Sequence, residues 1–236
     1  MSKPKIQISW SGGKDSAYAL YKLMQEDKYE IVGLHTVIEE NDKKVGIHNI
    51  KEELIEKQAE SIGLPLTKLY LKKKPLAYEK LMADYYKQLK NEGVENVMFG
   101  DIFLEDLKDF RESILHNSGI KGVYPIWQKD TIQLVKDFLN LKFKTILCAV
   151  DAKHIDEDWV GEELSLDFIY EHPNIDPCGE NGEYHSYVIE GPVFKLPIKL
   201  NQKGKYSLDY TFNVKDENGN DQVIEDTFYY ADLELS

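Results

Sequence analysis

Six residues near the amino terminus have the types and the order of a phosphate-binding loop. The loop reads SGGKDS and consists of Ser11, Gly12, Gly13, Lys14, Asp15 and Ser16. Two adjacent glycines let the chain turn tightly and present backbone N–H groups without side chains in the way. The residues after the loop predict a helix, whose positive dipole end adds to the attraction for an anion. The SGGKDS loop therefore predicts a site for a phosphate-rich ligand.

The spacing of this loop differs from the two most familiar nucleotide motifs. A Walker A loop needs G-x-x-x-x-G-K-[ST] and a dinucleotide loop needs G-x-G-x-x-G, and neither pattern fits. Asp15 places a negative charge where phosphate should bind, which makes sense if it orients backbone or works through a cation. The same residues could form a plain glycine turn capped by serine and aspartate. The flanking strand and helix favour the nucleotide site.

A second loop gathers ionisable side chains between residues 176 and 186. It contains Cys178, Glu180, Glu183 and His185 in close succession. Groups this close influence one another, and at least one carboxylate could act as a base or as a ligand for a cation. The spacing fits a hairpin turn at Asn181-Gly182 with exposed glutamates equally well. The residues alone leave both interpretations open.

Strands and helices alternate in the first half of the chain and must position these loops. Apolar runs indicate strands at 6–10, 30–38, 66–71 and 94–99, and amphipathic runs indicate helices at 17–24, 50–62, 75–90 and 103–116. The apolar run 122–127 completes the alternation. This order is typical of an α/β fold with a doubly wound, mainly parallel sheet.

Ligands of such sheets bind beyond the carboxyl ends of the strands. Two pairs of polar or small residues, His35-Thr36 and Gly100-Asp101, follow predicted strands, as the SGGKDS loop does. We therefore expect all three segments to meet at one edge of the sheet. His35 is equally consistent with a packed core histidine, and Gly100-Asp101 with an ordinary turn at a strand end.

The second half of the chain changes character. A helix is predicted at 130–140 and a strand at 145–150, followed by an acidic stretch that lacks the ligand spacing of a metal site. The tail alternates apolar and polar residues over 206–214 and 222–235, and Asn218-Gly219 between them predicts a hairpin rather than a calcium loop. We predict two domains, 1–128 and 129–236, of which the second is a smaller α+β domain.

Composition narrows the classes of partner. The chain has 236 residues, with 42 acidic and 29 basic side chains and a net charge of −13. Binding nucleic acid through bulk charge needs clustered lysine and arginine, so this balance argues against it. We see no signal peptide and no apolar run near the roughly 18 residues of a membrane span. The cysteines, Cys148 and Cys178, form no C-x-x-C pair, which favours a reducing compartment. We predict a cytoplasmic protein.

Taken together, the two loops resemble those of the diphthine–ammonia ligase family, the ATP-binding domain-4 group of PP-loop ATP pyrophosphatases. SGGKDS is similar to the family's pyrophosphate loop, and GENGEYHS, residues 179–186, to its second motif. Further segments agree across nearly the whole chain: His48, Gln58-Ala59, 63–66, 124–127, 155–161 and 191–194. The resemblance implies a Rossmann-like nucleotide-binding fold of the adenine-nucleotide alpha-hydrolase type.

The resemblance also implies an ATP-dependent amidation. A carboxylate, in this family that of diphthine on elongation factor 2, is adenylated with release of pyrophosphate, and ammonia then displaces AMP. The SGGKDS loop would hold the pyrophosphate, with Mg²⁺ bridging phosphate oxygens. His35, Thr36, Gly100 and Asp101 would border the adenosine. Asp15, Glu180, Glu183 and His185 would be catalytic, and one of the last three would deprotonate or position ammonia. No residue is assigned to a metal site of the protein itself.

Departures from the family pattern surround the expected acceptor pocket. Many members read closer to GEGGEYET, whereas this chain has Asn181, His185 and Ser186. Asp101 replaces an alanine that is common in the family, and Glu162 an arginine. The use of ATP is therefore better defined than the identity of the carboxylate acceptor. If the protein came from a bacterium, which has no diphthamide, the acceptor would have to be another carboxylate.

Two alternative functions and a dimer complete the sequence-based predictions. One is a tRNA-modifying enzyme of the thiolation type, for which Cys178 would be the reactive thiol. The other is a regulatory module that binds ATP without turnover. The long tail strands, rich in tyrosine and phenylalanine, could offer an edge to a second subunit, and we expect a homodimer.

Overall fold

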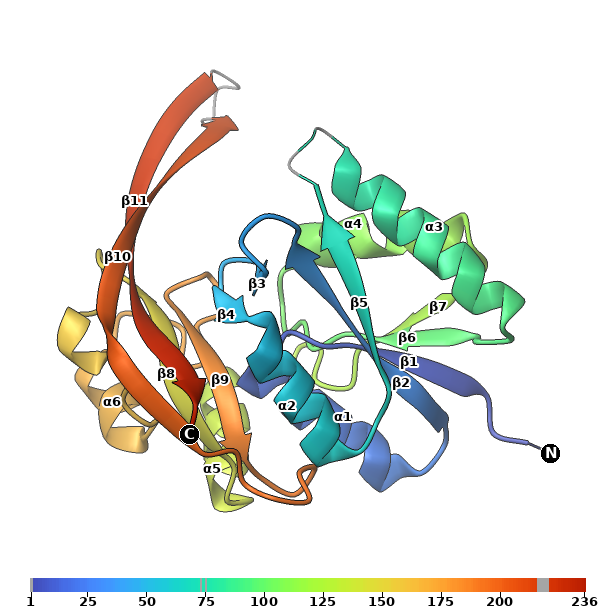
Figure 1. Cartoon of the computed structure of the whole chain (residues 1–236), viewed down its shortest axis with the longest axis horizontal. Helices are drawn as coiled ribbons and strands as arrows, with labels where there is room; N and C mark the ends of the chain where they lie inside the picture. Colours follow the sequence, from blue (N-terminus) through green and yellow to red (C-terminus); the bar gives the residue numbers. More distant parts are fainter. Residues whose placement is uncertain (1, 73, 75, 216–220) are drawn as a thin grey trace.

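Five parallel strands form the central sheet of the computed structural model, which describes residues 2–72, 74, 76–215 and 221–236. Their order is β5-β2-β1-β6-β7, so the chain starts in the middle and winds outwards in both directions (Figure 1). The bounds are β1 Lys5–Ser9, β2 Glu30–Glu39, β5 Leu66–Leu71, β6 Asn96–Met98 and β7 Lys121–Val123. All pairings within this sheet are parallel. The predicted α/β fold with a doubly wound, mainly parallel sheet is confirmed.

Helices cover both faces of the sheet. They are α1 Lys14–Glu26, α2 Glu52–Ile62, α3 Ala77–Asn91 and α4 Glu105–His116. Alternate strand residues point to opposite faces. Accordingly, Ile6 and Ile8 of β1 join the large core with α1 and α2, whereas Val97 of β6 and Phe99, directly after it, pack with α3 and α4. Both faces of the strands are thus buried, which explains their nearly continuous apolar runs.

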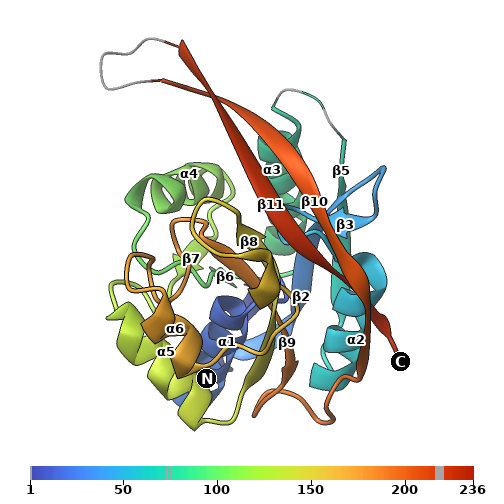
Figure 2. The same ribbon diagram turned by 90° about the vertical axis from the view of Figure 1, so that its left-hand side faces the viewer.

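An antiparallel sheet follows, with the strand order β10-β11-β8-β9. Its strands are β8 Lys144–Asp151, β9 Tyr184–Glu190, β10 Leu200–Lys215 and β11 Asp221–Leu235, and it is accompanied by α5 Thr131–Asn140 and α6 Leu166–Glu171. The β10–β11 hairpin curves away from the rest of the molecule (Figures 1 and 2). The predicted boundary at residue 128 falls between β7 and α5, and the division into two domains stays a prediction.

The second sheet is joined to the first unit through the SGGKDS loop. The N–H of Val188 on β9 donates to the carbonyl of Gly12 at 3.0 Å. Gln58 of α2 is fully buried and donates to the carbonyls of Gly12 and Val188 at 2.9 and 2.7 Å. Its own oxygen accepts the indole N–H of Trp10 at 2.9 Å. These bonds satisfy buried polar groups on both sides and fix the loop against β9.

Several predicted elements differ in extent. The run 122–127 forms a strand only in β7, because Pro125 has no N–H for a ladder and the chain turns there. The strand predicted at 94–99 is reduced to Asn96–Met98. Helix α3 begins at Ala77, and Pro75, where we predicted its start, lies outside the described residues. The predicted Asn218-Gly219 turn also lies outside them.

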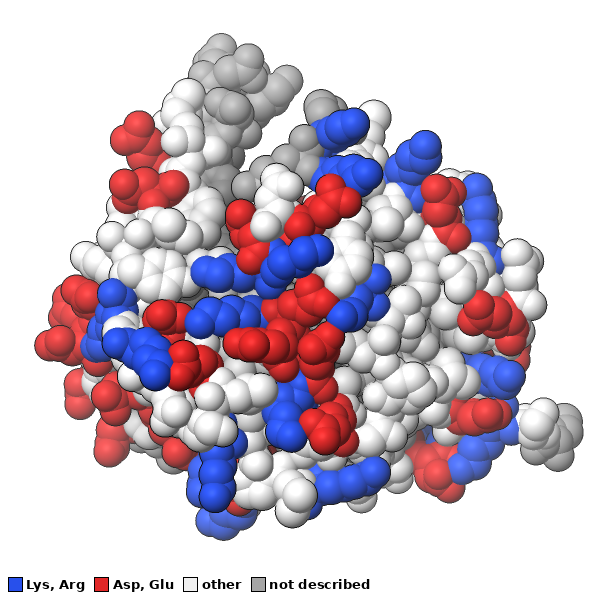
Figure 3. Space-filling model, viewed as in Figure 1, with Lys and Arg blue, Asp and Glu red and all other residues white. Residues whose placement is uncertain are grey.

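The surface shows no simple charge pattern on the face seen in Figure 3. Lysine and arginine side chains there are interspersed with aspartate and glutamate. A protein surface that binds nucleic acid through charge presents clustered basic residues instead. Among the described residues, none of the helices combines the length and the apolar character that crossing a bilayer requires.

Candidate active site

The SGGKDS loop joins β1 to α1 at the carboxyl edge of the parallel sheet. Gly12 has a φ of 86°, a left-handed conformation that glycine adopts without strain. The Ser16 hydroxyl donates to the Gly13 carbonyl at 2.9 Å. The Lys14 N–H, at the start of the helix, donates to Ser186 Oγ at 3.1 Å. The loop therefore has the form of an anion-binding turn at a helix N-terminus, and β9 supports it from the side.

The Lys14 side chain is buried below the loop. Its ammonium donates to Asp15 Oδ2 at 2.9 Å and to the carbonyl of Cys178, and it lies 4.8 Å from the centre of the Tyr184 ring. Burial works against the charged form, but Asp15 and Tyr184 outweigh it and hold the pKa of Lys14 well above its ordinary value. Lys14 is thus a fixed cation that connects the two loops.

The end of β6 touches the start of α1. A Cβ on Gly100 would lie 2.9 Å from backbone atoms of Asp15 and Ser16, so only glycine permits this approach. Asp101 follows and is buried, and its Oδ1 accepts a hydrogen bond from Arg111 Nη2 of α4 at 3.1 Å, while Arg111 Nε lies 2.7 Å from Oδ2 as an ion pair. This charge-assisted contact fixes both side chains at the edge of the site.

The two glutamates of the second loop have different positions. Glu183 is buried, and its oxygens accept the backbone N–H of Asp176 at 2.8 Å and of Asn181 at 3.1 Å. The Asn181 side chain donates to it as well, at 3.1 Å. Glu183 therefore holds the loop in shape from inside.

Glu180, in contrast, faces the space between the loops. One carboxylate oxygen accepts the backbone N–H of Ile102 at 2.7 Å. Burial raises the pKa of Glu180 to about 7, and the negative charge of Asp15 adds to this, against the opposing effect of the Ile102 N–H. A carboxylate that changes charge near neutral pH is suited to general base catalysis.

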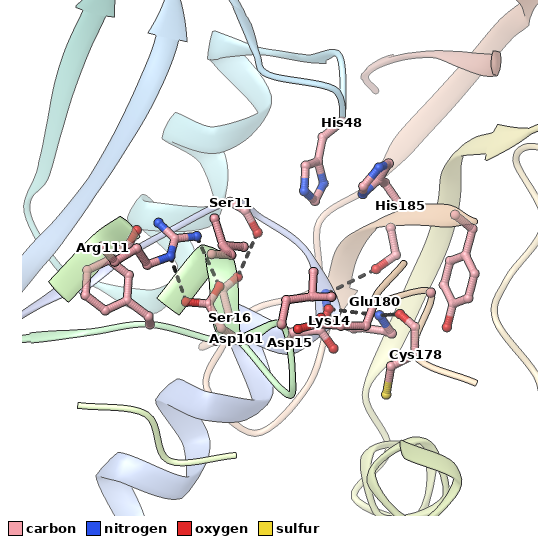
Figure 4. A pocket seen from close by; sticks show the side chains of 18 residues that line it. Ser11, Lys14, Asp15, Ser16, His48, Asp101, Arg111, Cys178, Glu180 and His185 are labelled. Carbon is pink, nitrogen blue, oxygen red and sulfur yellow. Dashed lines mark hydrogen bonds and ion pairs between the residues drawn. The ribbon is translucent and has the colours of Figure 1, made fainter. Parts of the chain in front are cut away.

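A cavity of about 220 Å³ lies between the two loops and the end of β6 (Figure 4). It brings together eight of the predicted site residues: Ser11, Lys14, Asp15, Ser16, Gly100, Asp101, Glu180 and His185. Gly12 and Gly13 contribute the turn beside it. The expected meeting of segments at the carboxyl ends of β1 and β6 is therefore observed.

A neighbouring cavity of about 330 Å³ shares Ser11 and Arg111 with the first and is lined by Thr36. Thr36 thus lies where a nucleotide could extend away from the SGGKDS loop. His35 lines neither cavity. It is 1% exposed and packs against Tyr85 and Tyr86, with ring centres 5.1 and 6.3 Å away. The core position that we considered for His35 is the one observed.

The burial of His35 predicts sensitivity to acid. Burial, followed by the charge of Arg111, lowers the pKa of His35 to about 3. The unfolded chain takes up this proton near pH 6.5 and the folded chain does not, so stability falls by about 3 kcal/mol as the pH drops from 6.5 to 4. Urea titrations at several pH values measure this slope. His35→Phe should remove this contribution and leave the slope that buried His48 and His185 supply, and exposed His154→Gln should leave the slope unchanged; an unchanged slope in His35→Phe would contradict the prediction.

Two residues to which the sequence assigned no role also line the first cavity. His48 reaches it from the turn between β3 (Lys44–Val45) and β4 (Ile50–Lys51), and Arg111 from α4. Arg111 is a charged residue on an amphipathic helix, and its neighbours in the sequence do not distinguish it from an arginine that points into solvent. His48 is one of the residues that resemble the family. Because it lies in a short turn, no pattern around it predicted that its ring would line the cavity.

The carboxylates at the cavity fit a magnesium ion that arrives with a nucleotide. Mg²⁺ usually binds through one or two carboxylates together with substrate phosphates. Asp15 and Asp101 both line the cavity and supply such oxygens. Within the described part of the chain, no group of three or more histidine, cysteine, aspartate or glutamate side chains could hold a metal by itself.

Comparison with known proteins identifies the family. A model described as the diphthamide synthase N-terminal domain matches residues 4–122, and one described as the C-terminal domain matches residues 130–216. The chain belongs to the diphthamide synthase family. This confirms the predicted family, and the assignment of GENGEYHS as a variant of the family's second motif stays a prediction.

Relatives in this family carry the name diphthine–ammonia ligase. The mouse protein is 24% identical over 80% of this chain and 79% of its own length. The human protein is 25% identical with the same coverage of both chains. The Schizosaccharomyces pombe protein is 27% identical over 82% of this chain, which corresponds to only 35% of the longer relative. The named relatives are ligases that form a carbon–nitrogen bond.

Proposed function

We propose that this member of the diphthamide synthase family is an ATP-dependent amide ligase. It adenylates a carboxylate with release of pyrophosphate and then joins the acyl group to ammonia. One observation carries this proposal: the SGGKDS loop and Glu180 of the second loop line a single cavity. A phosphate site and a base are thereby close enough to act on one substrate. The names of the relatives support the same reaction.

The nucleotide would extend across both cavities. Its pyrophosphate end would lie against the N-terminus of α1, where backbone N–H groups and the serines of the loop are available. Its adenosine would enter the neighbouring cavity beside Thr36. Magnesium, when bound to the phosphates, neutralises charge that builds up on the leaving group. Asp15 and Asp101 would hold this ion, and for Asp101 this role replaces the contact with adenosine that the resemblance implies.

Two displacements complete the reaction. In the first, an oxygen of the acceptor carboxylate attacks the α-phosphorus, and the bond to pyrophosphate breaks. In the second, the nitrogen of ammonia attacks the acyl carbon and AMP leaves with the shared oxygen. The nitrogen loses a proton on the way to the neutral amide. We assign the acceptance of this proton to Glu180, because it lines the cavity and its pKa is about 7.

Product analysis tests the proposal directly. The protein is incubated with ATP, Mg²⁺, ammonium and candidate carboxylate acceptors, among them diphthine on elongation factor 2. AMP and pyrophosphate, formed together with an amide, are expected. ADP and phosphate would contradict the adenylation chemistry. Binding of ATP without any turnover, with every acceptor offered, would favour a regulatory module.

The thiolation alternative predicts an essential cysteine, and the environment of Cys178 does not favour it. Cys178 is 2% exposed, and its thiol lies 3.4 Å from the carbonyl of Thr131. Burial raises the pKa of this thiol far above its ordinary value, so the reactive thiolate is suppressed. We therefore expect Cys178→Ser to keep AMP formation within about threefold of the wild type. Loss of all turnover in this variant, with ATP binding intact, would instead support thiolation.

Three further expectations stay open. The acceptor is proposed to be diphthine on the strength of the relatives' name, and the cytoplasm is the proposed compartment. The expected homodimer is tested by light scattering of the purified protein. None of these affects the assignment of the two loops to a single cavity.

A further inference from the structure

The first cavity has more negative than positive side chains. Its lysine and arginine, Lys14 and Arg111, face three carboxylates, those of Asp15, Asp101 and Glu180. Both cations are already paired, Lys14 with Asp15 and Arg111 with Asp101. The polyphosphate of ATP brings several further negative charges. A bound magnesium ion offsets part of this charge, and the rest needs another source of positive charge.

Two histidines form the wall of the cavity beside the glycine turn. The rings of His48 and His185 have centres 4.6 Å apart and are tilted by 42°. A Cβ on Gly13 would lie 3.1 Å from His48 Cε1, so this ring lies directly against the SGGKDS loop. Figure 4 shows both rings on the same side of Lys14. They come from separate units of the fold, His48 from the β3–β4 turn and His185 from β9.

Each of these rings keeps a buried nitrogen without a partner. His48 Nδ1 and His185 Nε2 have no hydrogen-bond partner in the described part of the chain. Leaving a buried polar nitrogen unpaired is unfavourable, so such groups call for a ligand or a water molecule. Both residues line the cavity in which we place the phosphates.

Without a ligand, both rings are neutral at physiological pH. Burial, and then the charge of Lys14, lowers the pKa of His48 to about 4, with a small opposing effect from the Ser186 backbone. Burial, followed by His48 and Lys14, holds the pKa of His185 well below its ordinary value. The Phe228 ring, 6.4 Å from that of His185, adds no charge. An anion that enters the cavity reverses this balance, because it favours the protonated form of both rings.

We propose that His48 and His185 bind the polyphosphate of ATP and take up at least one proton from solvent as the nucleotide enters. Each protonated ring donates an N–H to a phosphate oxygen, and the protons return to solvent when pyrophosphate leaves. The inference rests on the proposed function, because it places the phosphates on the SGGKDS loop. It replaces a role for His185 in proton removal from ammonia with a role in binding.

Histidine NMR on the wild-type protein tests this without any mutation. The chain has six histidines, so ¹⁵N-labelled rings give few signals. The protein is titrated near neutral pH with Mg²⁺–pyrophosphate and with the Mg²⁺ complex of α,β-methylene-ATP. At least one ring of the pair is expected to change from the neutral to the imidazolium pattern. The single variants His48→Gln and His185→Gln assign the signals.

Two negative results have different meanings. If both rings stay neutral in the saturated complex, the inference is wrong while the proposed function stands. If neither ligand binds in the presence of Mg²⁺, the proposed function itself is contradicted.

Calorimetry gives an independent measure. Binding of the ATP analogue, measured in buffers of different ionisation enthalpy, is expected to show net proton uptake by the wild type. Its affinity should rise as the pH is lowered from 8 towards 6. In the double variant His48→Gln/His185→Gln, the uptake should fall by the share of the two rings, while Glu180, whose pKa is about 7, keeps its own share, and the affinity should fall by about tenfold or more. Exposed His116→Gln is the control and should behave as the wild type. Undiminished proton uptake in the double variant would overturn the inference.

Discussion

Replacing Lys14 by methionine is expected to remove both stability and activity. Methionine has a similar length but no charge, so Asp15 loses its partner at 2.9 Å and the Cys178 carbonyl loses a donor. Removing one partner of a buried ion pair costs about 3 kcal/mol or more. The cavity also gains net negative charge, which opposes the binding of phosphate. We expect AMP formation to fall by about a thousandfold. Urea unfolding and AMP release measure the two effects.

Two comparisons separate the causes of this loss. Lys22 lies on the exposed side of the same helix, so Lys22→Met should change neither the stability to urea nor AMP formation appreciably. The double variant Lys14→Met/Asp15→Asn has no unpaired charge, so it should recover much of the stability but none of the activity. If Lys14→Met unfolds at the wild-type urea concentration and turns over ATP normally, the lysine is not the link between the loops that we describe.

Glu180→Gln is expected to impair the amidation step and leave ATP binding nearly unchanged. Glutamine keeps an oxygen for the N–H of Ile102, which Glu180 accepts at 2.7 Å, so the local geometry is retained. What it loses is the ability to accept a proton, which is worth about 10²–10⁴ in rate. The pKa of about 7 also predicts that wild-type activity rises with pH through neutrality, because the base must be ionised. This rise should be absent in the variant.

The measurement is ammonium-dependent amide formation between pH 6 and 9, together with ATP affinity. Glu183→Gln is the matched comparison in the same loop. Glu183 accepts the N–H of Asp176 and of Asn181, and glutamine can serve only part of this set. That variant should therefore lower the urea midpoint and keep the pH profile. Full ammonium-dependent turnover in both variants would show that neither glutamate acts as the base.

The first loop could be predicted because its elements are neighbours in the chain. A short β-prone run, two glycines and a run of helix formers specify strand, turn and helix through local backbone preferences. The alternation of apolar strands and amphipathic helices predicted the parallel sheet in the same way, because the spacing of apolar residues within each element indicates which of its faces are buried. The position of the site at one edge of the sheet could then be predicted, since the carboxyl ends of parallel strands lie at the same edge.

The sequence could not distinguish residues whose roles depend on distant partners. His35 and Thr36 are adjacent, yet His35 packs against tyrosines of α3 and Thr36 lines a cavity, because neighbouring strand residues point to opposite faces. Glu180 and Glu183 have similar local surroundings. Only the folded loop directs one to the cavity and the other to backbone N–H groups.

The amino-acid sequence alone was thus enough to predict the phosphate-binding loop, the fold class and the family. Each of these depends on contiguous residues whose types restrict their own conformation. Only the tertiary structure placed His48 against His185 and Lys14 between the two loops. The physical reason is that charge balance and burial are properties of the packed site. They arise when β9 lies against the SGGKDS loop and the side chains of Lys14 and Ser16 become buried.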